Sequence, residues 1–269
     1  MLKTRVVTAL LLVTGLLAAL FLLPQAGVVV IFTAIAAIAA WEWAGLLKAG
    51  VFGRWLFGLA TLLPCAALYA LGMPTPLLAA LWLLALLFWL LLVPLWFRQR
   101  WPLRANMTGF LIGWLLLIPS WAGMVQLHAR SPWLLLAAMA LVWIADIAAY
   151  FSGRALGRHK LAPEISPGKT WEGAIGAAIG VLVYAAMLAS ATGWLAKLTA
   201  LQTLLATLGL LLLTAVSILG DLFESLAKRQ AGVKDSSALL PGHGGVLDRI
   251  DSLTSTLPLV GLAVMLGAH

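Results

Sequence analysis

The chain consists mainly of long apolar runs separated by short polar segments. Each of nine runs is long enough to cross about 30 Å of hydrocarbon as a helix, and none shows the alternating polarity of membrane strands. The runs cover roughly residues 6–23, 28–47, 55–72, 77–96, 107–127, 132–151, 171–192, 201–220 and 252–268. This pattern predicts an all-α fold, a polytopic transmembrane helical bundle of about nine spans.

The composition agrees with a membrane protein. The 269 residues are 63% hydrophobic and 10% charged, whereas soluble domains carry about 25% charged residues. The single cysteine, Cys65, excludes an internal disulfide and a thiolate metal cluster. The first apolar run is longer than the core of a signal peptide and no A-x-A site follows it, so we interpret it as the first span.

The basic residues indicate the orientation of the chain. With nine spans, all of the 17 lysines and arginines except Arg130 and Lys197 fall on one side of the membrane. The positive-inside rule places that side in the cytoplasm, so we expect a multi-pass protein of the inner (plasma) membrane with a cytoplasmic N-terminus. The net charge of +8 is then a topology signal. It is not accompanied by any nucleic-acid-binding signature, and no nucleic-acid partner is expected.

The polar residues divide the chain into two regions. We expect five N-terminal transmembrane helices over residues 1–130 and a C-terminal catalytic region over residues 131–269, with long cytoplasmic loops at 152–170 and 221–251. All acidic residues except Glu42 lie from Asp146 to Asp251, in or beside these loops. Ionisable groups near the membrane are usually functional. Glu42 lies in the second span, where it is expected to pair with a basic group or to be protonated.

The loop at 221–251 begins with a polar helical face. Ser217, Asp221, Glu224, Ser225 and Lys228 have spacings that bring them to one side of a helix. The helix over 201–220 is therefore expected to continue beyond the membrane surface. A solvated amphipathic extension without any chemical role would show the same pattern.

A glycine-rich turn and two carboxylates follow in the same loop. Backbone N–H groups around His243, Gly244 and Gly245 can form an anion-binding nest, although a plain turn has a similar composition. Asp248 and Asp251 share a helix face and can bind a divalent cation together, or they can simply begin a solvated helix. Because carboxylates, basic residues and a glycine turn occur together, we favour a site for phosphate transfer.

The loop at 152–170 carries a second polar pattern. Asp146, Tyr150 and Arg154 recur every four residues on one face of the helix over 132–151. The sequence around Lys169 is not a P-loop, because Pro163 stands where the first glycine is required. We expect an irregular loop in which Lys169 contacts a phosphate or a lipid headgroup. A lysine that only sets the topology is the alternative.

Together these segments resemble the signature of the phosphatidate cytidylyltransferases, also called CDP-diacylglycerol synthases. The resemblance rests on Ser225-x-x-Lys228-Arg229-x₄-Lys234-Asp235-x₅-Pro241-Gly242-His243-Gly244-Gly245-x-x-Asp248-Arg249-x-Asp251-Ser252, on Asp146-x₃-Tyr150-x₂-Gly153-Arg154 and on Ser166-Pro167-x-Lys169-Thr170-Trp171-Glu172-Gly173. Gly168 departs from the pattern, since a basic residue is often expected there. The motifs cover roughly residues 146–252, and the N-terminal half matches only as a bundle of spans.

The resemblance implies an enzyme of phospholipid biosynthesis, a nucleotidyltransferase that converts CTP and phosphatidate to CDP-diacylglycerol and pyrophosphate. It implies Mg²⁺ as cofactor, with K⁺ as a further candidate, an active site on the cytoplasmic side, and a homodimer. The metal ligands would be Asp221, Asp248 and Asp251, which with Lys228 form the expected catalytic set. The expected substrate-binding residues are Arg229, Lys234 and Arg249 for the phosphates, Ser225, Asp235, His243, Gly244 and Gly245 for CTP or pyrophosphate, and Asp146, Tyr150 and Lys169 for the lipid.

Two other functions fit parts of the pattern. A CTP-dependent membrane lipid kinase would use similar metals but would transfer the γ-phosphoryl group. An ion-coupled transporter would use Asp146 and Asp221 as an ion site, which normally lies at the membrane midplane. These carboxylates are predicted at helix ends instead, so the transporter is the weaker alternative.

Overall fold

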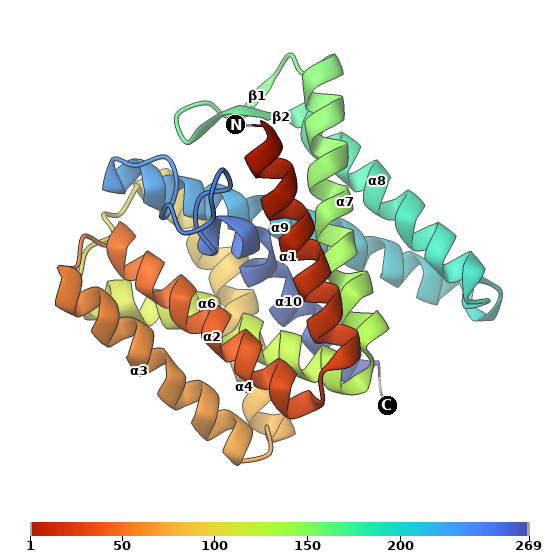
Figure 1. Ribbon diagram of the computed structural model, residues 1–269. Helices are drawn as coiled ribbons and strands as arrows, with labels where there is room; N and C mark the ends of the chain where they lie inside the picture. The colour runs from red at the N-terminus through yellow and green to blue at the C-terminus, as the bar shows by residue number, and fades with distance from the viewer. Residues whose placement is uncertain (1, 268–269) are drawn as a thin grey trace.

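The computed structural model describes residues 2–267. Its helices and strands, in chain order, are α1 (Leu2–Leu22), α2 (Gln25–Leu46), α3 (Val51–Ala70), α4 (Thr75–Leu87), the π-helical turn η1 (Phe88–Leu92), α5 (Val93–Gln99), α6 (Met107–Arg130), α7 (Pro132–Leu156), β1 (Lys160–Ala162), β2 (Ser166–Thr170), α8 (Trp171–Ala191), the 3₁₀ turn η2 (Leu195–Lys197), α9 (Ala200–Ala231) and α10 (Leu247–Leu266). Figure 1 shows these helices as one bundle, with α1 lying across the front.

The predicted all-α membrane bundle is confirmed. Within residues 2–267, eight helices are long and apolar enough to cross a membrane, counting the continuous segment Thr75–Gln99 as one, and a shorter apolar helix covers Val6–Leu22. Large apolar side chains such as Leu63 of α3 and Ile175 of α8 are exposed along the outside of the bundle. Lipid is the solvent in which such a surface is stable.

The helices differ from the apolar runs mainly at the end of the bundle that carries the polar loops. Helix α9 continues to Ala231, which confirms the extension predicted from its polar face, and α7 continues to Leu156. The two long loops therefore shrink to residues 157–170 and 232–246. The first was expected to be irregular, but it forms an antiparallel hairpin in which Lys160 pairs with Thr170. Thr170 then caps α8, because its hydroxyl accepts the Gly173 N–H at 3.1 Å.

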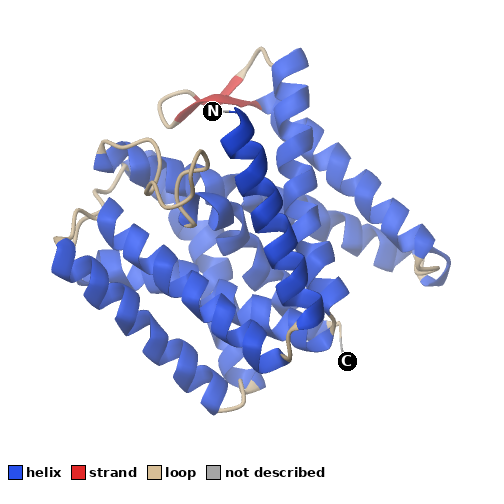
Figure 2. Ribbon diagram, in the orientation of Figure 1, coloured by secondary structure: helices blue, strands red, loops and turns tan. Residues whose placement is uncertain are grey.

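The hairpin and the loop 232–246 lie at the same end of the bundle (Figure 2). Helix α1 begins at this end, since the Thr8 hydroxyl donates to the carbonyl of Pro241 in the loop. Helix α10 starts at the loop and runs away from it for 20 residues, or about 30 Å. The first and last helices therefore start at one end of the bundle, and α10 finishes at the other.

Helix α10 is the centre of the packing. Residues 252–259 are all buried, and the helix lies against α9, α6 and α4. Two glycines allow the close approach: a Cβ at Gly123 of α6 would lie 2.8 Å from the Leu257 carbonyl oxygen, and one at Gly220 of α9 would lie 2.9 Å from that of Asp251. Because α6 and α10 pack together, the division proposed at residue 130 separates the sequence but not the hydrophobic core.

Candidate active site

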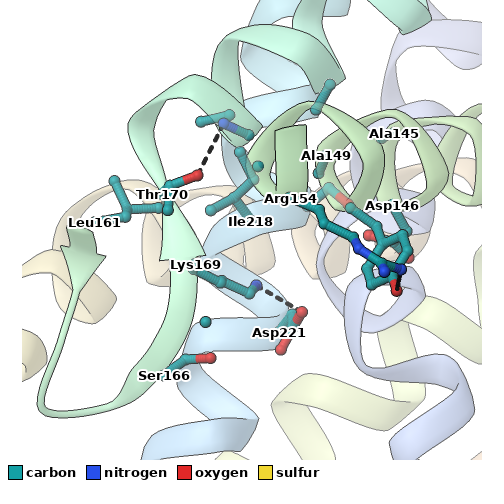
Figure 3. A pocket seen from close by; sticks show the side chains of 17 residues that line it. Ala145, Asp146, Ala149, Arg154, Leu161, Ser166, Lys169, Thr170, Ile218 and Asp221 are labelled. Carbon is teal, nitrogen blue, oxygen red and sulfur yellow. Dashed lines mark hydrogen bonds and ion pairs between the residues drawn. The ribbon is translucent and has the colours of Figure 1, made fainter. Parts of the chain in front are cut away.

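A cavity of about 430 Å³ opens where α7, the hairpin and α9 meet. Its polar lining includes Asp146, Tyr150 and Arg154 from α7, and Lys169 and Asp221 from β2 and α9. The four-residue spacing on α7 places the first three on one helix face. Figure 3 shows Lys169 and Asp221 facing each other at one side of the cavity and Asp146 and Arg154 at the other. The structure thus brings together residues of both long loops.

The cavity is also lined by small residues. They are Ala145 and Ala149 of α7 and Ala174 and Ala177 of α8. These helices pack closely: a Cβ at Gly176 would lie 2.5 Å from the Ser152 Cβ, so a larger residue there would separate them. The lining of the cavity consequently combines charged side chains with small apolar ones.

An ion pair joins the hairpin to α9. The Lys169 Nζ lies 2.5 Å from the Asp221 Oδ2, and both side chains are largely buried. The Ser225 hydroxyl donates to the other oxygen of Asp221 at 3.2 Å. Arg229, one turn further along α9, donates from its Nε to the Ile165 carbonyl at 3.3 Å. Helix α9 therefore holds the hairpin through Asp221 and Arg229, two of the candidate site residues predicted from the sequence.

A second polar cluster lies deeper, between α9 and the start of α10. The Lys228 Nζ is 2.6 Å from the Asp248 Oδ1 and 3.3 Å from the Glu224 Oε1. The other Asp248 oxygen accepts the Ser236 N–H, the Ser236 hydroxyl and the Gly245 N–H at 2.8–2.9 Å. Both oxygens of Asp248 are thus occupied by protein donors, and this carboxylate organises the loop 232–246.

The loop 232–246 closes on itself around the glycine turn. Gly242 and Gly244 have φ values of 77° and 82°, a region that favours glycine. Leu240 and Gly244 form an isolated bridge, with the Leu240 N–H donating to the Gly244 carbonyl at 2.8 Å. The His243 N–H donates back to the Leu240 carbonyl, and its buried ring Nδ1 has no hydrogen-bond partner among the side chains that the structure describes. Two N–H groups of the expected anion nest, those of His243 and Gly245, therefore already have protein acceptors.

Glu42 is the site residue for which the sequence offered no partner. Its side chain is completely buried, and its carboxylate accepts from the hydroxyls of Ser236 and Ser237 and from the N–H groups of Val246 and Leu247. Among the residues whose side chains are described, 6–194 and 196–267, it forms no ion pair. Hydrogen bonds from the loop thus occupy the carboxylate for which a basic partner was one of the two expectations. Ser236 was also missed, because a serine in a polar loop carries no signal of its own.

The remaining predicted residues surround the two clusters. Lys234, Asp235 and Arg249 are exposed at the loop and at the start of α10. Asp251 is half-buried, its Oδ1 accepts the Ser252 N–H at 2.7 Å, and it lies close enough to Asp221 and Asp146 for their charges to interact. Three carboxylates from α7, α9 and α10 therefore approach one another.

These carboxylates have the donor chemistry of a hard-cation site. Glu224 adds a fourth carboxylate: it is buried, interacts with the charge of Asp251, and neither oxygen has a hydrogen bond of good geometry, although Lys228 lies 3.3 Å away. Within residues 2–267, no group of three or more histidine, cysteine, aspartate or glutamate side chains is placed to hold a metal. Mg²⁺ commonly uses only one or two carboxylates together with water and substrate phosphates. The carboxylates therefore offer the oxygen ligands that Mg²⁺ uses, but further ligands would have to come from water and the substrates.

Comparison with known proteins identifies relatives along almost the whole chain. Residues 3–266 match the model of the cytidylyltransferase family. A phosphatidate cytidylyltransferase of Pseudomonas aeruginosa is 45% identical over 273 residues, covering 96% of this chain and 95% of its own. One from Haemophilus influenzae is 38% identical, with 96% of each chain covered. A third, from Brucella suis, is 53% identical over 127 residues, which is 46% of this chain and 43% of its own.

Proposed function

The chain belongs to the cytidylyltransferase family and transfers CMP from CTP to phosphatidate, and we propose that this reaction occurs where α7, α9, α10 and the hairpin meet. The products are CDP-diacylglycerol and pyrophosphate, so the enzyme serves phospholipid biosynthesis. The observation that carries the proposed location is the cavity whose lining contains both the Lys169–Asp221 ion pair and small apolar residues. A lipid with a phosphate headgroup requires both kinds of lining.

The phosphatidate headgroup binds between Lys169 and Arg154 in this proposal. The Lys169 ammonium has three donors, so it can keep its contact with Asp221 and still donate to a phosphate. Arg154 uses one donor on the Tyr150 hydroxyl at 3.1 Å and has others available for the same phosphate. The alanines of α7 and α8 leave room for the glycerol and the first part of the acyl chains.

CTP binds from the cytoplasm, between α9 and the loop 232–246. Lys234 and Arg249 are exposed on this side, so they can reach the β- and γ-phosphates. Arg229 and Ser225 belong to the same face of α9. His243, Gly244 and Gly245, together with Asp235, shape the turn against which the nucleotide lies. Lys228 is held by Asp248 and Glu224, and places a buried positive charge beneath the phosphates.

Mg²⁺ is the proposed cofactor, with Asp221 and Asp251 as the first candidates for ligands and Asp146 beside them. When bound, the ion offsets the charge of the two anionic substrates and of the departing pyrophosphate. Asp248 remains a predicted ligand, but a metal bound there would have to displace Lys228 or the loop donors. K⁺ is a further candidate at the same group of carboxylates.

The reaction needs no nucleophile from the protein. An oxygen of the phosphatidate phosphate attacks the α-phosphorus of CTP, the new P–O bond forms, and the bond to the β-phosphate oxygen breaks to release pyrophosphate. Lys169 and Arg154 orient the attacking phosphate, while Lys228, Lys234 and Arg249 stabilise the negative charge that develops on the leaving group. The site lies at a membrane surface because one substrate is a lipid and the other is soluble. The proposal places it on the cytoplasmic side, in a homodimer.

Incubation of the purified protein in mixed micelles with α-³²P-labelled CTP, phosphatidate and Mg²⁺ tests the assignment. Label should appear in a lipid that co-migrates with CDP-diacylglycerol, and unlabelled pyrophosphate should be released. With γ-³²P-labelled CTP, the label should remain in the water-soluble product. A lipid labelled only from the γ-position would identify a lipid kinase and contradict the proposal.

A further inference from the structure

Glu42 connects the second helix to a loop that follows it by about 200 residues in sequence. Its Oε1 accepts from the Ser237 hydroxyl at 2.6 Å and the Val246 N–H at 3.0 Å. Its Oε2 accepts from the Leu247 N–H at 2.6 Å and the Ser236 hydroxyl at 3.3 Å. The four donors come from two separate parts of the loop 232–246 and from the first residue of α10. One buried carboxylate therefore fixes both sides of the loop.

We propose that Glu42 is a positioning residue for CTP, which acts by holding the loop 232–246 in its nucleotide-binding conformation. The inference rests on the proposed function, because it assumes that this loop receives CTP. Glu42 has no exposed surface, so it acts through the loop and not by direct contact with the nucleotide.

A carboxylate suits this position for two physical reasons. The N–H groups of Val246 and Leu247 stand at the N-terminus of α10, where unpaired donors and the helix dipole favour a negative charge. A buried charge also requires several hydrogen bonds, and Glu42 receives three from Ser237, Val246 and Leu247, while the Ser236 hydroxyl is shared with Asp248. An amide could accept at only one atom and would turn its own donors toward the other N–H or hydroxyl groups.

The loop is packed directly on this carboxylate. A Cβ at Gly245 would lie 2.5 Å from the Glu42 Oε1, so only glycine fits between the loop and α2. The neighbouring Gly245 N–H donates to Asp248, which in turn holds Lys228. Ser236 lies between the two carboxylates, 3.3 Å from Glu42 and 2.9 Å from Asp248. Loss of the Glu42 charge would therefore disturb the loop and the Lys228 cluster together.

The lipid side of the site does not depend on these contacts. Lys169 is placed by β2 and by Asp221 of α9, and no hydrogen bond or ion pair of Glu42 within the described part of the chain reaches the hairpin. The proposal consequently predicts a selective effect: a change at Glu42 should weaken CTP binding and leave phosphatidate binding nearly unchanged.

The first experiment measures KM for each substrate in Glu42→Gln. Loss of charge-assisted hydrogen bonds should raise the KM for CTP about 10- to 100-fold, whereas the KM for phosphatidate at fixed surface concentration should change by less than about threefold. Ser237→Ala removes one of the four donors and should raise the KM for CTP by a smaller factor. In the double variant, Ser237→Ala should raise the KM for CTP little beyond the effect of Glu42→Gln alone, because both changes remove the same contact between Ser237 and Glu42.

Ser120→Ala is the matched control. The Ser120 hydroxyl is also buried, and it also joins α10 to the N-terminal half, by donating to the Leu253 carbonyl at 3.2 Å. It lies away from the loop, so its loss should leave both KM values unchanged. Equal increases of both KM values in Glu42→Gln, or an unchanged KM for CTP in a folded Glu42→Gln protein, would overturn the proposal. If Glu42→Gln does not fold, Ser237→Ala decides: an unchanged KM for CTP overturns it.

A labelling experiment distinguishes failure of this inference from failure of the proposed function. Ala238 is exposed in the loop, so a cysteine introduced there reports loop order through its rate of reaction with a maleimide. The rate should rise in the Glu42→Gln background and should lose its protection by added CTP. If the Glu42 change raises the rate but the wild type makes no CDP-diacylglycerol, the enzyme assignment fails while the loop contact stands. If the rate is the same in both backgrounds, the positioning role fails.

Discussion

Replacing Asp248 and Asp251 by asparagine, one at a time, should separate loop stability from catalysis. The Asp248 carboxylate accepts from Lys228 at 2.6 Å and from Ser236 and Gly245 at 2.8–2.9 Å, so every donor around it depends on a buried negative charge. Removing one partner of a buried ion pair costs about 3–5 kcal/mol. Glu224 lies 3.3 Å from Lys228 and partly compensates, so we expect about 3 kcal/mol for Asp248→Asn.

Asp251 is surrounded differently, and its replacement should have the opposite effect on stability. Its charge is repelled by Asp221, Asp146 and Glu224; Lys228 attracts it, but burial and repulsion outweigh that attraction, and the Ser252 N–H donates to it. An asparagine oxygen can still accept from Ser252, while the repulsion disappears. Asp251→Asn should therefore be as stable as the wild type or more stable. Its activity should still fall at least about 100-fold, as expected when one element of transition-state stabilisation is lost.

The chain carries its own probe for this comparison. Cys65 is the single cysteine and is fully buried in α3, so reaction with a thiol-sensitive fluorophore on heating in detergent reports unfolding. Asp248→Asn should unfold at a lower temperature than the wild type, and Asp251→Asn should not, whereas both should lose CMP transfer. Similar unfolding temperatures for the two variants, or a lower one for Asp251→Asn, would refute this assignment of roles.

Three further predictions concern the loops. A cysteine in place of Ala238 should react with a membrane-impermeant thiol reagent in inverted vesicles but not in intact cells, and labelling in intact cells would contradict a cytoplasmic site. Lys169→Ala should raise the KM for phosphatidate roughly 10- to 150-fold and more than the KM for CTP. Lys234→Ala should raise the KM for CTP more than the KM for phosphatidate, and equal changes of both KM values in either variant would contradict this division of roles. Gly245→Ala should impair CTP binding in calorimetry because its Cβ has no room, whereas Gly168→Ala meets no atom within 4 Å and should behave as the wild type.

The spans were predictable because their cause is local. A run of some 20 apolar residues must form a helix in lipid, where every backbone group needs a partner within the segment. The extension of α9 was predictable for a similar reason, since the spacing from Ser217 to Lys228 fits a single helical face. The hairpin was not expected, because its pairing of Lys160 with Thr170 leaves no apolar alternation in the sequence.

The site was only partly predictable, because its contacts join distant segments. Motif spacing indicated Lys169 and Asp221 as candidate site residues, but their ion pair depends on how β2 packs on α9. Asp248 and Asp251 lie three residues apart on one helix. Asp248 accepts from donors of the loop, whereas the charge of Asp251 interacts with the carboxylates of α7 and α9. For Glu42, the partners follow some 200 residues later, and periodicity within one helix carries no information about them.

The contact of Glu42 with the loop 232–246 also constrains how the protein is made. At a synthesis rate of about 5–20 residues per second, the partners of Glu42 emerge roughly 10–40 s after α2. During that interval the carboxylate lies four residues, or about 6 Å, from the end of its helix, near enough to the membrane surface to remain hydrated. Withdrawal of Glu42 from water requires Ser237, Val246 and Leu247, so the nucleotide loop and α10 complete the bundle in one late step. A ribosome-bound chain that stops before residue 236 would therefore hold α2 in the membrane with its acidic group still at the membrane surface.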